Sequence, residues 1–376
     1  MPPLGVEIDR SDTSTVGQLN SELLRRRQEH AAAFEAALKE TFLAQGIQLV
    51  EPLAKASKET VVYGARYHGD AVAVKIFVPA IDDLEDTISA FGAFKVECEK
   101  TMILSRRSPH ILQVIEYGDA ELPKNLPDEL RDFFPIKLLP FMLTERARYG
   151  SLDRVMRATH KPPGLDRLGL LEALCAATDG IHEAHLHHVA HRDIKPQNIL
   201  VFGPNEAKIA DFGIARWRTR RVNRETVLLT PKYASPEQAF YALTGEHEQL
   251  VDLRGDIYSW TIMVYELVTG HHPFSWAIHT AANVKDVIGQ QRTLLKAIAA
   301  NDRRGFAATG DITFDALVDS CTCDIKSRIT NISLANRVLR QFVQRMRMQL
   351  DEARKLSEEH AKAQQIARTR RKTTNH

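Results

Sequence analysis

Cysteine is scarce in this chain of 376 residues, which contains four: Cys98, Cys175, Cys321 and Cys323. Only the last two are close in the sequence, and no histidine pair completes a zinc-binding set around them. A secreted scaffold held by disulfides is therefore disfavoured. We expect reduced, mostly buried thiols in a cytoplasmic protein.

Long apolar runs and a strong net charge are also missing. No uninterrupted apolar stretch is long enough to cross a bilayer, and the first residues lack the basic-then-apolar layout of a secretory signal. The formal net charge of +2 gives no reason to expect nucleic acid or an anionic membrane as a main partner. With 44% hydrophobic residues, the chain is long enough for two lobes with separate cores.

The hydrophobic pattern divides the chain into a strand-rich part and a helical part. Residues 21–44 show helical spacing, and strands are predicted from Ile47 to about residue 143, interrupted by a helix over residues 91–105. After Gly150 the pattern is helical, and a charged helix with one apolar stripe is predicted near the end.

A polar segment in the helical part carries the strongest chemical signal. It reads His-Arg-Asp-Ile-Lys-Pro-Gln-Asn over residues 191–198, and Asp-Phe-Gly follows at 211–213. The two motifs supply carboxylates, an amide and an ammonium group in a short stretch of chain, as phosphoryl transfer requires. Because both occur, in this order, a chance match in a polar turn is disfavoured.

These motifs resemble the catalytic loop H-R-D-x-K-x-x-N and the D-F-G motif of protein kinases. The resemblance covers roughly residues 47–342. Ser-Pro-Glu-Gln-Ala at 235–239 is similar to bacterial members of the eukaryotic-like (Hanks-type) serine/threonine class. The resemblance implies an α+β, bilobal protein-kinase fold with a small antiparallel β-rich N-lobe and a larger helical C-lobe. The implied domains are an N-terminal helical extension (1–46), the N-lobe (47–143), the C-lobe (144–342) and a charged helical C-terminal extension (343–376).

The resemblance assigns a catalytic role to each motif residue. Asp193 would accept the proton of the attacking hydroxyl, and Lys195 would neutralise the γ-phosphate of ATP. Asn198 and Asp211 would hold Mg²⁺, a hard ion that prefers oxygen ligands. Lys75, which ends the strand Ala-Val-Ala-Val-Lys, would hold the α- and β-phosphates rather than lie on an edge strand as a surface lysine.

Lys75 needs a carboxylate partner from the helix predicted over residues 91–105. Counting back from Ser-Pro-His-Ile at 108–111, which resembles the H-P-N-I turn of the family, selects Glu99. Glu97 is the fallback. The two glutamates lie on different faces of a helix, so only one can point inward.

The implied nucleotide site departs from the family in its loop. The glycine positions of G-x-G-x-x-G-x-V are Lys55, Ser57 and Thr60 here, and Val62 matches the valine. Glycine lets backbone amides approach phosphate without a Cβ in the way, so we expect a stiffer loop and weaker hold on ATP. This departure keeps open a pseudokinase or weak kinase that acts as a regulated binding module.

The remaining nucleotide contacts are implied by the spacing of Thr-Glu-Arg-Ala at 144–147 to Gly-Ser-Leu at 150–152. They are Ala73 on the strand before Lys75, Thr144 at the back of the pocket, and the backbone groups of Glu145 and Ala147.

The segment after Asp-Phe-Gly resembles an activation segment ending in Thr-Pro-Lys-Tyr-Ala-Ser-Pro-Glu at 230–237. Lys195 together with Thr230 indicates protein serine or threonine hydroxyls as acceptors. The same peptide-docking segment disfavours a kinase for small molecules.

Basic residues and a threonine in this segment suggest a switch. Phosphorylation of Thr226, or of Thr219 as the second candidate, would create a charge partner for Arg192 and order the segment. The alternative, weighed evenly, is a mobile basic loop that recruits an acidic substrate.

Three further residues are implied in the architecture of the C-lobe. Glu237 would form a buried, bidentate pair with Arg328. Asp256 would steady the backbone of the catalytic loop.

The C-terminal stripe from Leu339 to Leu356 could pair with a second chain as a coiled coil. We slightly favour docking on the catalytic domain itself or on a partner over self-association. The basic tail lacks interleaved aromatic residues, so we expect no nucleic acid partner, and no membrane.

Overall fold

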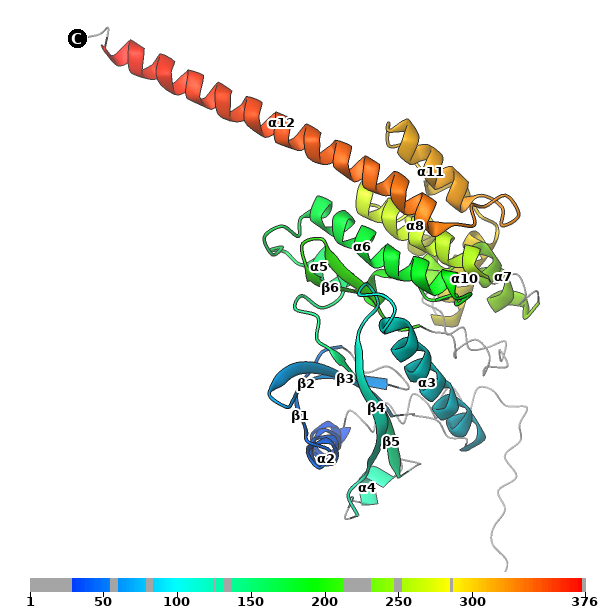
Figure 1. The fold of residues 1–376 in the computed structure, drawn as a ribbon. Helices are drawn as coiled ribbons and strands as arrows, with labels where there is room; N and C mark the ends of the chain where they lie inside the picture. Colours follow the sequence, from blue (N-terminus) through cyan, green and yellow to red (C-terminus); the bar gives the residue numbers. More distant parts are fainter. Residues whose placement is uncertain are drawn as a thin grey trace, which may run out of the picture.

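The computed structural model describes residues 29–54, 60–78, 84–124, 126, 128–131, 137–212, 231–246, 252–284 and 287–373. Figure 1 shows a β-rich N-lobe, drawn in blue to cyan, and a mostly helical C-lobe, drawn in green to orange. The predicted α+β, bilobal fold is confirmed.

The N-lobe is built on a five-stranded antiparallel sheet in the order β1-β2-β3-β5-β4. The strands are β1 (Ile47–Pro52), β2 (Thr60–Tyr67), β3 (Asp70–Phe77), β4 (Val114–Glu121) and β5 (Leu138–Glu145). The β2–β3 hairpin turns at His68 and Gly69, whose φ values of 51° and 92° suit a tight two-residue turn. Because β3 lies between β2 and β5, Lys75 projects from an interior strand and not from an edge.

In the described part of the chain three helices accompany this sheet: α2 (Ala31–Leu43), α3 (Leu84–Ser105) and the short α4 (Asp128–Arg131). Phe34, Leu38 and Phe42 of α2 are buried in one core cluster with the sheet, and the Phe42 ring meets Phe141 edge-on at 5.4 Å. Helix α3 packs on a second cluster through Phe94 and neighbouring residues. Helix α2 is therefore part of the N-lobe core.

The C-lobe is organised around α8 (Leu253–Thr269), most of whose side chains are buried. The other elements are α5 (Leu152–Arg157), α6 (Arg167–Leu186), η1 (Pro196–Asn198), β6 (Ile199–Gly203), β7 (Glu206–Ile209), η3 (Pro231–Tyr233), α7 (Pro236–Thr244), α9 (Ser275–Ala282), α10 (Val287–Ala299), η5 (Arg303–Gly305), α11 (Ile312–Thr322) and α12 (Ile332–Thr373). Strands β6 and β7 form a separate antiparallel pair.

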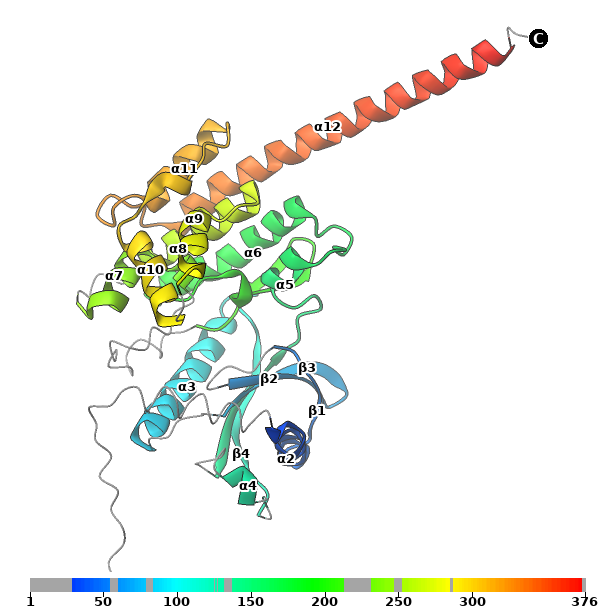
Figure 2. The same ribbon diagram turned by 180° about the vertical axis from the view of Figure 1, so that it is seen from behind.

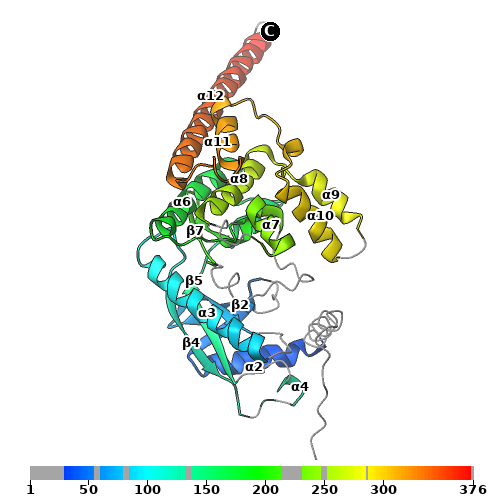
Figure 3. The same cartoon turned by 90° about the vertical axis from the view of Figure 1, so that its right-hand side faces the viewer.

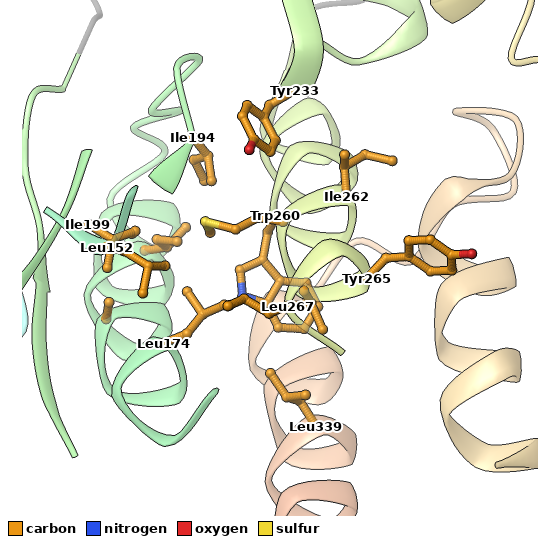
Figure 4. Packing of buried hydrophobic residues seen from close by; sticks show 14 of the residues in the cluster. Leu152, Leu174, Ile194, Ile199, Tyr233, Trp260, Ile262, Tyr265, Leu267 and Leu339 are labelled. Carbon is orange, nitrogen blue, oxygen red and sulfur yellow. The ribbon is translucent and has the colours of Figure 1, made fainter. Parts of the chain in front are cut away.

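Trp260 lies at the centre of the C-lobe core. It is fully buried on α8, with Leu174 of α6 and Leu339 of α12 near it (Figure 4). Its indole Nε1 donates a hydrogen bond of 2.8 Å to Thr178 Oγ1 on α6. This bond satisfies a polar group that would otherwise be costly to bury.

Helix α12 docks on the C-lobe with its first turns and then leaves it. Asn336 and Arg340 both donate to the carbonyl of Cys175 on α6, and Arg347 pairs with Glu172. From residue 349 to 364 every side chain is exposed. Figures 2 and 3 show this part projecting away from both lobes. The beginning of the helix thus docks on its own domain, while self-association stays a prediction.

The predicted boundary between residues 342 and 343 falls inside this continuous helix, and the division of the chain into four segments stays a prediction. Among the described residues, no helix combines the length and apolar character needed to cross a membrane. The predicted cytoplasmic location stays a prediction.

Candidate active site

The predicted catalytic loop, residues 191–198, is fixed by one buried carboxylate on α8. Asp256 accepts hydrogen bonds of 2.7 Å from the backbone amides of His191 and Arg192, and its Oδ2 lies 2.8 Å from Nε2 of His185. Burial by itself would raise the pKa of Asp256, but the hydrogen bond and charge of His185, with those of His191, lower it overall. The carboxylate can therefore hold Arg192 at a φ of 65°, in the left-handed region.

Three polar side chains converge in this loop. Lys195 Nζ donates to Asp193 Oδ2 at 2.7 Å, and Asn198 Nδ2 donates to the same oxygen at 3.1 Å. Asn198 Nδ2 also donates to the Asp193 carbonyl at 2.8 Å. Asn198 is buried and Asp193 is half-buried. The Asp193 carboxylate is thus held in one orientation while remaining accessible to a substrate.

Lys75 links the two lobes. Its Nζ lies 2.7 Å from Glu97 Oε1 on α3 and 2.7 Å from Asp211 Oδ1, which follows β7 in the C-lobe. The Lys75 and Glu97 side chains are only 9% and 7% exposed, whereas Asp211 is 43% exposed. Lys75 therefore connects Glu97 in the N-lobe core to Asp211 at the more exposed edge of the C-lobe.

The assignment of Glu99 as the partner of Lys75 is wrong, because the structure pairs the lysine with Glu97. Glu99 is exposed. Side chains two positions apart on a helix point in directions that differ by about 200°, so Glu97 and Glu99 cannot face the same way. Glu97 shares the face of Phe94 and Thr101, both buried. The apolar spacing around these residues was a signal for Glu97, whereas counting from the turn assumed the family's loop length.

The position of Asp211 is set by its neighbours. The Phe212 side chain is fully buried, and its ring centroid lies 4.8 Å from that of His191. His191 Nε2 donates to the Ala210 carbonyl at 2.8 Å, and the Ala210 amide donates to the Asn198 carbonyl at 2.9 Å. Asp211 itself has a φ of 60°. This strained backbone is held by contacts on both sides, as is common at functional sites.

The predicted metal ligands Asn198 and Asp211 lie on adjoining strand ends. Both can offer oxygen, the donor that Mg²⁺ prefers, and Asn198 has its amide nitrogen turned to Asp193. Among the described residues no group of three or more His, Cys, Asp or Glu side chains could hold a metal. Two oxygen donors fit an ion that takes its remaining ligands from phosphates and water.

The predicted adenine contacts share one face of the N-lobe sheet. Val62 pairs with Lys75 across the β2–β3 ladder, and Ala73 pairs with Thr144 across β3–β5. Thr144 is buried, and its hydroxyl donates to the Ala73 carbonyl at 3.4 Å. Thr60, at the start of β2, is also buried.

Five predicted residues lie outside the described residues: Lys55 and Ser57 of the nucleotide loop, and Thr219, Thr226 and Thr230 of the activation segment. Their roles stay predictions. Ala147 follows β5 in the segment that joins the two lobes, residues 144–147, which we call the hinge, and it is half-buried.

The predicted pair in the C-lobe is present. Arg328 contacts Glu237 with two parallel bonds, Nη1 to Oε1 at 2.6 Å and Nη2 to Oε2 at 3.3 Å. The two side chains are 1% and 5% exposed. Next to Glu237, Gln238 closes a capping box with Ser235 and donates to the Arg192 carbonyl at 2.9 Å. The Ser-x-x-Gln spacing was a signal for the cap, but not for the bond to the catalytic loop.

One contact at the hinge has no counterpart in the sequence-based predictions. Lys208 on β7 pairs with the carboxylate of Glu145 at 2.7 and 2.8 Å, and the Gln113 amide donates to the same carboxylate at 2.7 Å. A lone lysine in a strand gives no signal for such a partner 63 residues away.

Comparison with known proteins agrees with this geometry. The protein kinase domain matches residues 59–355, which is more than half of the chain. Serine/threonine-protein kinase PknB of Mycolicibacterium smegmatis is 33% identical over 213 residues, covering 56% of this chain and 30% of the relative. PknB of Mycobacterium tuberculosis is 31% identical over 214 residues, with the same coverage.

PknL of Mycobacterium tuberculosis is 34% identical over 139 residues, which cover 36% of this chain and 32% of the relative. The matched region thus spans less than a third of the length of each of these relatives. The similarity to bacterial kinases that the motifs indicated is confirmed.

Proposed function

The chain belongs to the protein kinase family, and we propose that it is an active, ATP- and Mg²⁺-dependent serine/threonine kinase acting on protein hydroxyls. The observation that carries the proposal is the double contact of Lys75 with Glu97 and Asp211, 2.7 Å each. It joins the proposed phosphate-binding lysine of one lobe to the proposed metal-binding aspartate of the other. Phosphoryl transfer depends on this kind of positioning and charge neutralisation more than on covalent help.

Mg·ATP, when bound, supplies the transferable phosphoryl group and cationic charge. The residues of the chain would orient the substrates and neutralise their negative charge. Asp193, held by Lys195 and Asn198, would orient the acceptor hydroxyl and take its proton at the carboxylate. Lys195 would then be close enough to the transferred group to offset its negative charge.

Around the nucleotide, Asn198 and Asp211 would hold Mg²⁺, and Lys75 would hold the phosphates of ATP. The Glu145 amide already donates to the Gln113 carbonyl at 3.1 Å, so a backbone contact from Glu145 to adenine would use its carbonyl. Ala147 would supply the complementary amide, with Thr144 behind the base.

A transfer assay tests this proposal. The protein is incubated with labelled Mg·ATP and a generic protein acceptor, beside Asp211→Ala and the control Asp70→Ala, which removes an exposed carboxylate at the β2–β3 hairpin. We expect transfer by the wild type and by the control, and loss in Asp211→Ala. If the wild type binds nucleotide but transfers no phosphate, the result would instead support the alternative that the departure from the glycine-rich loop keeps open, a pseudokinase that acts as a binding module.

We further propose that the enzyme phosphorylates its own activation segment at Thr226. In support, Nε of Arg192 is buried and has no hydrogen-bond partner among the residues that the structure describes. A phosphate brought by the segment could supply that partner. Phosphosite mapping, with Asp193→Asn as the inactive control, tests this. An active preparation without phosphate on Thr226 would contradict it.

A further inference from the structure

The Glu145 carboxylate joins three segments that each carry part of the active site. Glu145 ends β5 at the hinge, and its side chain accepts from Lys208 Nζ at 2.7 and 2.8 Å and from the Gln113 amide at 2.7 Å. Lys208 lies on β7, three residues before Asp211. Gln113 lies between α3, which carries Glu97, and β4.

Neighbouring contacts prevent these segments from moving independently. The Leu112 amide donates to the Ile209 carbonyl at 2.9 Å, and the Ile209 amide donates to the His110 carbonyl at 2.9 Å. The chain before Gln113 is therefore hydrogen-bonded to β7 next to Lys208. The Lys208 ammonium also lies 4.8 Å from the centroid of the Phe202 ring on β6, which limits where it can point.

The environment of the contact makes it stronger than an ordinary surface pair. The Lys208 and Glu145 side chains are 15% and 26% exposed. Both carboxylate oxygens are engaged, and Oε1 accepts two bonds with charge assistance. Partial burial weakens screening by water and salt.

We propose that Lys208, through the Glu145 carboxylate, is a positioning residue that holds the hinge backbone in its nucleotide-binding arrangement. The inference rests on the proposed function, because the hinge is where adenine would bind. If the hinge is already ordered before ATP binds, no binding free energy is spent on ordering it. Losing the contact should weaken ATP binding and leave the chemistry of bound substrate almost unchanged.

Steady-state kinetics of the full chain test the role. For Lys208→Met, which keeps the length and removes the charge, we expect KM for ATP to rise about five- to tenfold and kcat to change less than twofold. Lys208→Arg should restore the wild-type KM, because a guanidinium can also bind a carboxylate with two bonds. Lys95→Met is the matched control, since Lys95 pairs with Asp119 at 2.7 Å and does not touch the hinge.

A double-mutant cycle separates positioning from general destabilisation. Glu145→Gln should raise KM as Lys208→Met does, and the double variant should be no worse than either single one. Additive losses, an unchanged KM in Lys208→Met, or an equal rise in Lys95→Met would overturn the proposal. A fall in kcat by the same factor as the rise in KM would also overturn it.

Hydrogen exchange provides a readout that does not depend on catalysis. The Glu145 amide donates to the Gln113 carbonyl, and the Gln113 amide donates to the Glu145 carboxylate. Peptides covering residues 110–114 and 143–148 should exchange faster in Lys208→Met than in Lys95→Met. If the wild type transferred no phosphate but the two variants showed this difference, the proposed function would fail and the hinge contact would stand. Identical exchange in both variants would refute the hinge contact.

Discussion

The partner of Lys75 provides the sharpest test of the active site. Glu97→Gln keeps the shape of the side chain and removes its charge, whereas Glu99→Gln makes the same change two residues along α3. Glu97 is 7% exposed and 2.7 Å from Lys75 Nζ, while Glu99 faces solvent. The two substitutions should therefore differ widely in effect.

The magnitude follows from the contact that is lost. A hydrogen bond to a charged group contributes about 1.5–3 kcal/mol, and each 1.36 kcal/mol corresponds to about tenfold in rate. Lys75 keeps its second contact with Asp211, so the larger cost of an isolated buried charge does not apply. We expect kcat/KM to fall about ten- to 150-fold in Glu97→Gln.

The assay compares initial rates of transfer at several ATP concentrations, with ATP binding measured separately by calorimetry. Glu99→Gln should stay within about twofold of the wild type, because exposed charges contribute little. Unfolding by urea checks that both variants are folded. A large fall in kcat/KM in Glu99→Gln with little change in Glu97→Gln would show that α3 is rotated differently in the active protein.

Three further predictions concern stability. Glu237→Gln should lower the free energy of unfolding by about 3–5 kcal/mol, because it leaves Arg328 buried without its counter-charge; urea denaturation measures this, and replacing both residues, Glu237→Leu with Arg328→Met, should cost less. Trp260→Phe should cost about 1–3 kcal/mol, since it removes the donor to Thr178; adding Thr178→Val should then cost little more, and two independent losses would contradict the shared bond. Burial and the charge of Lys232 lower the pKa of His272 to about 4 from 6.5. The unfolded chain therefore binds more protons between these values, and stability should fall by up to about 3 kcal/mol from pH 7 to pH 4; His272→Asn should flatten that slope, and an unchanged slope would refute the assignment.

Much of the proposed chemistry was readable because it is local. Asp193, Lys195 and Asn198 lie within six residues, and the turn they form lets three polar side chains meet whatever surrounds them. The strand that carries Lys75 was visible from its alternation of alanine and valine. The change between strand and helix periodicity near residue 150 indicated a strand-rich part and a helical part, and the resemblance to protein kinases implied that these parts are two lobes.

The choice between Glu97 and Glu99 illustrates what a linear pattern leaves open. Both residues have the same side chain, the same helix and almost the same distance from every motif. Only the rotation of α3 against the sheet buries one and exposes the other. That rotation is set by the packing of Phe94 and its neighbours against Phe77 and Met142, residues from two other strands.

By itself, the sequence determined which functional groups are available and in what local order, because spacing of a few residues fixes turns and faces of single elements. The tertiary structure decided which distant groups meet: Lys75 with Glu97, and Lys208 with Glu145 across 63 residues. The physical reason is that such contacts depend on how whole elements pack against each other. Packing is the sum of many small apolar contacts, so it cannot be predicted from any single residue in the sequence.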